Sequence, residues 1–115
     1  MTEAVFRRGD VVVCAFSGDY GKPRPALVVQ SDLFNETHAS VVLCPISSEI
    51  TGLSLFRVAI PASDAAGLRK DSEVMVDKLA AVRRTRVARR VGRLSRAQMA
   101  LVDGALRLWL ELPTS

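Results

Sequence analysis

Short apolar segments separated by turn-forming residues dominate the first two-thirds of the chain. They are rich in Val, Leu and Ile, and clusters of Gly, Pro, Asp and Ser lie between them. Apolar segments of this length predict β-strands, because the helices of globular proteins are usually longer. The predicted strands are Val11–Phe16, Ala26–Gln30, Ser40–Ile46, Leu53–Ile60, Ser72–Val82 and Arg89–Leu94. We expect Pro23-Arg24-Pro25 to precede the second strand rather than join it, since proline cannot donate to a strand ladder.

The last segment predicts a helix instead. Ser95 and Gln98 have the spacing of a capping box, in which each side chain bonds the backbone N–H of the other residue. The apolar residues that follow recur at helical spacing, namely Met99, Val102, Leu106, Trp109 and Leu110. Pro113 is expected to end an amphipathic helix over Arg96–Leu112. The expected fold class is therefore mainly β with a C-terminal α-helix, built as a small, strongly curved sheet or barrel.

Length and composition limit the classes that remain. The 115 residues predict a single domain over 1–115, and 49% apolar with 24% charged residues excludes disorder for most of the chain. No apolar run approaches the ~18 residues that a membrane span needs, and the N-terminus shows no secretory signal. Two cysteines cannot form a disulfide framework, and no Cys/His spacing predicts a zinc site. We therefore expect no membrane association and no bound metal.

Positive charge is concentrated in the last third of the chain. Residues 1–82 carry 8 basic and 10 acidic side chains, whereas residues 83–115 carry 8 basic and 2 acidic ones. Seven of those eight are arginines between Arg83 and Arg96. Such a cluster predicts an anionic partner, either nucleic acid or an acidic protein, although a solvated surface that keeps the protein in solution gives the same pattern.

Two short motifs are candidates for phosphate binding. Arg24 lies between two prolines, which restrict its backbone and would leave its guanidinium little entropy to lose on binding a phosphate. A charged residue at the start of a strand is the alternative. Ser47 and Ser48 follow an apolar strand, and their hydroxyls can donate to a phosphoryl oxygen or close a turn.

Together with their surroundings, these motifs have the order found in a known family. The chain resembles the MazF/PemK toxins of type II toxin–antitoxin systems, also called mRNA interferases. The residues that carry the resemblance are Arg8-Gly9-Asp10, Arg24–Gln30, Ile46-Ser47, Arg69–Val74 and Val91–Leu94, followed by the terminal helix.

The resemblance implies a barrel of the Kid/CcdB type, similar in shape to Src-homology-3 barrels, and a homodimer in the cytoplasm. It also implies a sequence-preferring endoribonuclease that needs no metal and no cofactor. Such an enzyme cleaves single-stranded mRNA to 2′,3′-cyclic phosphate and 5′-hydroxyl ends. Its expected partner besides RNA is a cognate acidic antitoxin that folds onto the toxin.

The same resemblance assigns candidate site residues. Arg24 matches the family's arginine and Ser47 its active-site threonine, so both are expected to be catalytic, with Lys22 and Ser48 beside them binding RNA. Asp77 matches an acidic residue of the family, and Lys78 stands where the family usually has Gln or His. Both are expected to contact RNA.

The loop Ser17–Lys22 departs from the family pattern, because it is shorter and lacks a Glu-Gln pair. Tyr20 in this loop can stack on an unpaired base or pack on the barrel. The chain has one histidine, His38, which excludes a mechanism with two histidines. We expect Arg24 to stabilise charge on the phosphorane and Ser47 to donate to the same phosphate.

Two other functions fit parts of the sequence. One is a gyrase-inhibiting toxin of the CcdB type, but its C-terminal Trp-Gly motif is replaced here by Trp109-Leu110. The other is a degenerate or non-catalytic nucleic-acid-binding barrel, which the shortened loop and Ser47 leave open.

Overall fold

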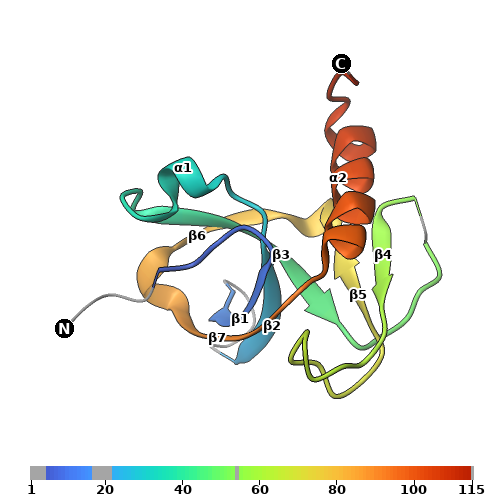
Figure 1. Ribbon diagram of the computed structural model, residues 1–115, viewed down its shortest axis with the longest axis horizontal. Helices are drawn as coiled ribbons and strands as arrows, with labels where there is room; N and C mark the ends of the chain where they lie inside the picture. Colours follow the sequence, from blue (N-terminus) through green and yellow to red (C-terminus); the bar gives the residue numbers. More distant parts are fainter. Residues whose placement is uncertain (1–4, 17–21, 54, 115) are drawn as a thin grey trace.

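Seven short strands form one curled antiparallel sheet in the computed structural model, which describes residues 5–16, 22–53 and 55–114 (Figure 1). The strands are β1 Asp10–Ala15, β2 Pro23–Val28, β3 Ser40–Ser47, β4 Arg57–Ile60, β5 Ser72–Met75, β6 Ala80–Arg83 and β7 Val87–Arg93. The helical segments are α1 Asp32–Asn35, the 3₁₀ turns η1 Val76–Lys78 and η2 Arg84–Arg86, and the long helix α2 Arg96–Leu110. The predicted mainly β fold with a C-terminal helix is confirmed.

Strand β3 lies at the centre of the sheet. The strand order is β4-β5-β3-β2-β1-β7, and β6 also pairs with β3. One edge of β3 pairs with β2, while the other edge pairs first with β6 and then, at Ile46 and Ser47, with β5. Within the described residues, the end strands β4 and β7 do not pair with each other, so the sheet is curled but not closed.

The hydrophobic core has two parts, because both faces of the central strands are covered. Val11 and Leu27 face a cluster that includes Val102 and Leu106 of α2. The adjacent residues Val12 and Val28 face a second cluster. Successive side chains of a strand point to opposite faces, so a fully buried strand has a continuous apolar sequence. This explains the run of three valines in β1 and the apolar sequence Ala26-Leu27-Val28 in β2.

Two of the predicted strands are wrong in extent. The predicted strand over Ser72–Val82 is divided into β5 and β6 by η1, where the backbone N–H of Leu79 donates to the carbonyl of Val76. The predicted strand over Leu53–Ile60 begins only at Arg57, because the Leu53 carbonyl accepts hydrogen bonds from the N–H groups of Phe56 and Arg57. Both turns redirect segments whose alternating pattern suits a straight strand.

The expectation that Pro23-Arg24-Pro25 lies outside the strand is also wrong. These residues pair with β1, with Arg24 opposite Cys14, whereas the pairing of β2 with β3 begins at Ala26. This end of β2 therefore has a ladder on one side only. An edge position does not require the backbone N–H groups that proline lacks.

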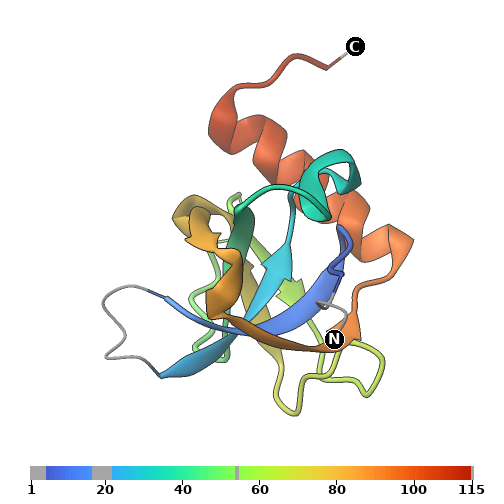
Figure 2. The same cartoon turned by 90° about the vertical axis from the view of Figure 1, so that its left-hand side faces the viewer.

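Helix α2 begins at the predicted capping box and ends two residues earlier than predicted. The Ser95 hydroxyl accepts from the N–H of Gln98, and the Gln98 side chain accepts from the N–H of Ser95. Glu111, with φ 55°, ends the helix in the left-handed conformation before Pro113. Figures 1 and 2 both show the last turns of α2 extending beyond the sheet.

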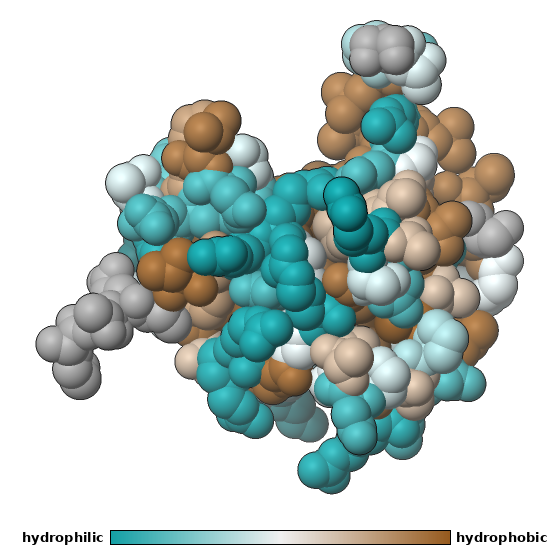
Figure 3. Space-filling model, in the orientation of Figure 1, coloured by the Kyte–Doolittle hydropathy of each residue, from teal (hydrophilic) through white to brown (hydrophobic). Residues whose placement is uncertain are grey.

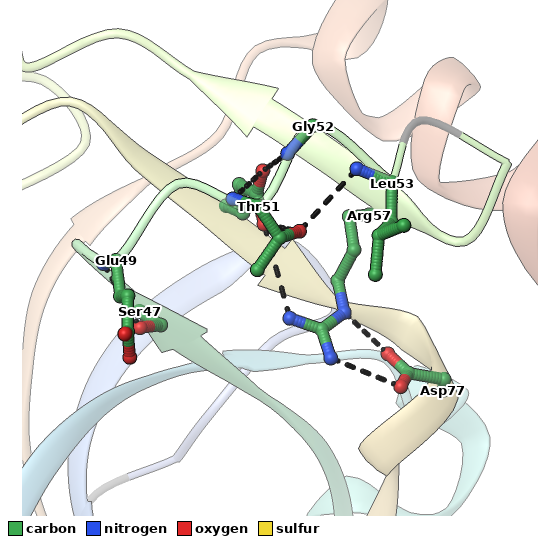
Figure 4. A network of polar contacts seen from close by, with 8 residues as sticks. Ser47, Glu49, Thr51, Gly52, Leu53, Arg57 and Asp77 are labelled. Carbon is green, nitrogen blue, oxygen red and sulfur yellow. Dashed lines mark hydrogen bonds and ion pairs between the residues drawn. The ribbon is translucent and has the colours of Figure 1, made fainter.

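A buried carboxylate holds the loop that follows β3 (Figure 4). Glu73 of β5 is 3% exposed, and its oxygens accept hydrogen bonds from the Thr51 N–H, the Thr51 hydroxyl and the Gly52 N–H at 2.9–3.0 Å. Arg57 Nη1 lies 3.8 Å from Glu73 Oε2, and Arg57 Nε donates to Asp77 Oδ1 at 2.7 Å. Burial alone would raise the pKa of Glu73, but the hydrogen bonds and the charge of Arg57 lower it below its ordinary value.

The loop before β5 packs directly on β7 through two glycines. A Cβ atom at Gly92 would lie 2.2 Å from the carbonyl carbon of Ala66 and 2.5 Å from the backbone nitrogen of Gly67. Gly67 has φ +71°, and a Cβ atom there would lie 2.3 Å from the Val91 carbonyl oxygen. Backbone therefore touches backbone, which leaves no room for a side chain at either position.

Replacing Gly92 with alanine is expected to destabilise the fold. Backbone atoms cannot rotate away from the added methyl as a side chain can, so we expect the free energy of unfolding to fall by about 1–3 kcal/mol. Gly104→Ala is the matched control, because nothing lies within 4 Å of its Cβ position and helix propensity alone would stabilise it by about 1 kcal/mol. Urea unfolding measures both changes. Equal stability of the two variants would contradict the close packing.

Replacing Glu73 with glutamine should make stability less sensitive to acid. The ionised carboxylate stabilises the folded state above the unfolded pKa of about 4.3, and this contribution is lost as the pH falls through the lower folded pKa. We expect Glu73→Gln to cost about 1–3 kcal/mol at pH 7 and clearly less near pH 3. Urea unfolding at both pH values measures this, with Glu36→Gln as an exposed control. A cost that does not change with pH would refute the assignment.

Candidate active site

A pocket of about 670 Å³ opens beside the ends of β2 and β3. Its walls come from β1, β2, the end of β3, the loop before β5, and β7. The lining residues are Val13, Arg24, Pro25, Ile46, Ser47, Ser48, Glu49, Gly67, Leu68, Arg69, Lys70, Ser72, Arg89 and Val91. The volume lies within the range of small-molecule sites.

The strand register brings Arg24 and Ser47 to the same place. Ala26 pairs with Pro45, Leu27 with Cys44 and Val28 with Leu43. Because the two strands are antiparallel, the start of β2, with Arg24, and the end of β3, with Ser47, lie at the same end of this ladder. Both residues line the pocket. Two motifs more than twenty residues apart in the sequence therefore meet in one site.

The pocket is strongly basic. Within the described part of the chain, its lining has four positive side chains, from Arg24, Arg69, Lys70 and Arg89, and one acidic side chain, from Glu49. All five residues are solvent-exposed. A concave surface with one sign of charge concentrates oppositely charged ligands, and arginine can bind a phosphate through two parallel hydrogen bonds. The pocket is therefore suited to a phosphorylated or polyanionic ligand.

The Ser47 hydroxyl is oriented by its own loop. The backbone N–H of Glu49 donates to Ser47 Oγ at 3.1 Å. A serine oxygen that accepts in this way still carries its own proton, which can be donated to a ligand. Ser47 is half-buried, and its backbone pairs with that of Glu73. The hydroxyl is therefore held on a rigid strand end.

The structure brings together three of the predicted site residues, Arg24, Ser47 and Ser48. Lys22 is exposed immediately before β2 and does not line the pocket. Tyr20 lies outside the described residues. The predicted roles of Lys22 and Tyr20 stay predictions.

Asp77 and Lys78 are located on η1, away from the lining of this pocket. The Asp77 carboxylate accepts two hydrogen bonds from Arg57, at 2.7 and 3.1 Å. Lys78 is exposed. Asp77 thus has a structural partner, which no local pattern predicts because Arg57 is twenty residues away. Contact of either residue with RNA remains a prediction.

Some arginines of the cluster between Arg83 and Arg96 pair with a buried carboxylate, whereas others face the solvent. Asp10 is 2% exposed, and it accepts from Arg90 Nε at 3.1 Å and from Arg93 Nη1 at 2.9 Å. These two arginines therefore neutralise a buried carboxylate, whereas Arg89 lines the pocket. Figure 3 shows hydrophilic residues spread over the face that carries β7, with apolar residues gathered on the outer part of α2.

Other reactive groups lie elsewhere. Cys14 and Cys44 are buried free thiols, as predicted, and burial raises the pKa of Cys44 to about 12. His38 is exposed and lies outside the pocket lining. In the described part of the chain, no three His, Cys, Asp or Glu side chains are grouped as metal ligands would be. No helix among the described residues is long and apolar enough to cross a membrane.

Sequence reasoning missed three charged residues of the pocket, Glu49, Arg69 and Lys70, and placed Arg89 only in the arginine cluster. The one local hint that Glu49 belongs to the site is its position two residues after Ser47 in the sequence. Arg69 and Lys70 reach the pocket through the backbone contact between Gly67 and β7, which no local pattern reveals.

Comparison with known proteins gives consistent matches along most of the chain. Residues 7–110 match the family model described as the PemK-like, MazF-like toxin of type II toxin–antitoxin systems. The probable endoribonuclease MazF of Mycolicibacterium smegmatis is 42% identical over 105 residues, which cover 90% of this chain and 95% of that protein. Endoribonuclease MazF9 of Mycobacterium tuberculosis is 29% identical, with 94% of this chain and 98% of that protein covered.

Solved structures agree with this assignment. A crystal structure of MazE-MazF from Deinococcus radiodurans superimposes with a TM-score of 0.79 at 25% identity, over 96% of this chain and all of that chain. The family match thus extends over β1 to α2 and includes both Arg24 and Ser47. On this evidence the chain belongs to the PemK-like, MazF-like toxins of type II toxin–antitoxin systems.

Proposed function

We propose that this protein is the endoribonuclease toxin of its toxin–antitoxin system and that it cleaves single-stranded RNA in the Arg24 pocket. The observation that carries the proposal is the meeting of Arg24 and Ser47 in one basic pocket. The relatives named as endoribonucleases support it, since they match nine tenths or more of the chain. The proposal includes a preference for particular RNA sequences and an action as one domain in the cytoplasm.

The cleavage reaction needs stabilisation of charge more than it needs a metal. The 2′-oxygen attacks the adjacent phosphorus, the 5′-oxygen leaves, and the products are a 2′,3′-cyclic phosphate and a 5′-hydroxyl. Arg24 balances the additional charge on the phosphoryl oxygens, and the Ser47 hydroxyl donates to the same group. An arginine pKa above 12 makes Arg24 a poor base, so its role is electrostatic. We therefore propose cleavage without a metal ion.

The remaining pocket residues bind the RNA chain in this proposal. Ser48 donates from beside Ser47, and Arg69, Lys70 and Arg89 hold neighbouring phosphates. Lys22, Tyr20, Asp77 and Lys78 contact RNA outside the pocket. Recognition of single-stranded RNA uses such backbone contacts together with stacking of unpaired bases.

Partners follow from the family and from the charge. A protein with this basic surface suits an acidic antitoxin that covers the RNA site. The Deinococcus radiodurans structure contains MazE together with MazF, which supports a protein partner for this chain. We also propose that the toxin is a homodimer. Two outcomes would replace the nuclease proposal: RNA binding without cleavage, or inhibition of gyrase.

Incubation of the protein with a transcribed mRNA in EDTA tests the reaction itself. We expect discrete fragments with 5′-hydroxyl ends, because none of the proposed steps uses a metal ion. Primer extension locates the cleavage sites. Direct labelling of the fragments by a polynucleotide kinase identifies their 5′-hydroxyl ends. Cleavage that requires added Mg²⁺ would contradict metal independence, and intact RNA would contradict the nuclease proposal as a whole.

Arg24→Ala and Ser47→Ala should each cleave the same RNA about 100–1000-fold more slowly, since each removes a donor to the transition state. Arg107→Ala is the matched control, because Arg107 is exposed on α2 and lies outside the pocket lining. Circular dichroism checks that each variant is folded. A folded Arg24→Ala protein with full activity would refute the assignment of this residue.

Neutralising Arg86 and Arg89 together should weaken RNA binding and reduce its dependence on salt. Each lost phosphate contact lowers the slope of log K against log salt by about 0.7 for a single strand. Arg90 is left in place, because its loss would remove a partner of buried Asp10. Binding of a 2′-O-methyl RNA, which cannot cyclise, measures affinity without cleavage. An unchanged slope for Arg86→Gln/Arg89→Gln would show that these charges do not contact or attract RNA.

A further inference from the structure

Glu49 is an unexpected residue in a pocket that binds phosphate. Among the described residues of the lining, it is the one acidic side chain beside four positive charges. Within the described residues, no hydrogen bond or ion pair involves its carboxylate, although its backbone N–H is bonded to Ser47. A carboxylate repels the phosphates that this pocket is suited to hold, so it does not contribute to phosphate affinity.

The backbone that carries this carboxylate is held by the loop. The Glu49 N–H donates to Ser47 Oγ at 3.1 Å, and the following turn is tied to buried Glu73 through Thr51 and Gly52. Figure 4 shows Glu49 and Ser47 at the same end of β3. Glu49 lines the same pocket as Ser47, so a sugar attached to a phosphate bound at Ser47 would lie on the side of the pocket that carries Glu49.

Cleavage of RNA by its own 2′-oxygen requires a group that takes the 2′ proton, and the other candidates in the described chain are poorly suited. His38 is outside the pocket lining, and both thiols are buried. Asp77 is bonded to Arg57 and is also outside the lining. Glu49 combines a place in the pocket with an unoccupied carboxylate.

We propose that Glu49 is the general base of the cleavage reaction, an inference that rests on the proposed endoribonuclease function. The Glu49 carboxylate takes the proton of the 2′-hydroxyl as the 2′-oxygen forms a bond to phosphorus. The bond from phosphorus to the 5′-oxygen breaks, and the 5′-oxygen leaves with the electron pair and takes a proton from water. The protonated Glu49 then returns its proton to solvent, so the reaction consumes nothing.

This role predicts opposite effects of one substitution on binding and on catalysis. Glu49→Gln keeps the size of the side chain, removes its negative charge and abolishes its basicity. Cleavage of the wild-type target RNA under single-turnover conditions should slow about 100-fold or more. Binding of the 2′-O-methyl form of that RNA should stay equal or become tighter, because a repulsive charge is gone.

Two further variants separate a base from a structural residue. Glu36→Gln removes an exposed carboxylate that lies outside the pocket lining, and it should cleave at the wild-type rate. Glu49→Ala in the presence of formate should recover activity in proportion to the formate concentration, because a free carboxylate can occupy the vacated space. Acetamide, which has a similar size and no basicity, should have no effect.

The outcomes are distinct from those of the proposed function. If the wild-type protein leaves RNA intact, the endoribonuclease proposal fails. If the wild type cleaves and Arg24→Ala does not, but Glu49→Gln retains the wild-type rate, the assignment of Glu49 alone is wrong. A slow Glu49→Ala protein that formate does not rescue, with weakened binding of the 2′-O-methyl RNA, would make Glu49 a binding residue instead of a base.

Discussion

The hydrogen-bonding edges of β3 are the constraint on which the rest of the fold depends. One edge is occupied by β2, and the other must be covered along its whole length by two successive strands, β6 and β5. The chain between those strands therefore has to turn, and η1 provides that turn. Because β2 is antiparallel to β3, the pairing that buries Ala26, Leu27 and Val28 also brings the start of β2 and the end of β3 to the same pocket. The site is a consequence of the sheet register.

Buried carboxylates explain why so many arginines are needed. Asp10 is neutralised by Arg90 and Arg93, and Asp77 by Arg57, which also lies near Glu73. Removing one of these arginines would leave a carboxylate with less compensation, so each has a role in the fold apart from any partner molecule. The concentration of arginine in the last third of the chain is thus partly structural. The part that remains for an anionic partner is smaller than the net charge suggests.

Sequence patterns correctly predicted the features that depend only on residues close together in the chain. The capping box at Ser95 and Gln98 appears as expected, because both of its hydrogen bonds join residues three apart in the chain. The division of Ser72–Val82 was missed, because an alternating pattern does not report where a neighbouring strand ends. Pro23 joined a strand for a similar reason, since whether an edge is free depends on distant residues.

The residues of the candidate site also divide into those that local motifs predict and those that only the fold brings together. Arg24 and Ser47 were found from motifs, whereas Arg69, Lys70 and Arg89 enter the pocket only through the packing of one loop on β7. That packing depends on the absence of side chains at Gly67 and Gly92, and a glycine in a sequence does not identify its neighbour. Charged residues that meet across a glycine contact can therefore be located only from the fold.

The polar network behind the pocket makes its geometry independent of any ligand. Glu73 ties Thr51 and Gly52 to β5, and the Glu49 N–H orients the Ser47 hydroxyl. Groups that are already oriented lose little entropy when a substrate arrives, and this is the condition under which hydrogen-bond donors stabilise a transition state most effectively. Burying Glu73 carries a desolvation cost in the folded state, which the hydrogen bonds from the loop offset. The stability of β5 and the readiness of the pocket thus depend on the same carboxylate, although it lines no part of the pocket itself.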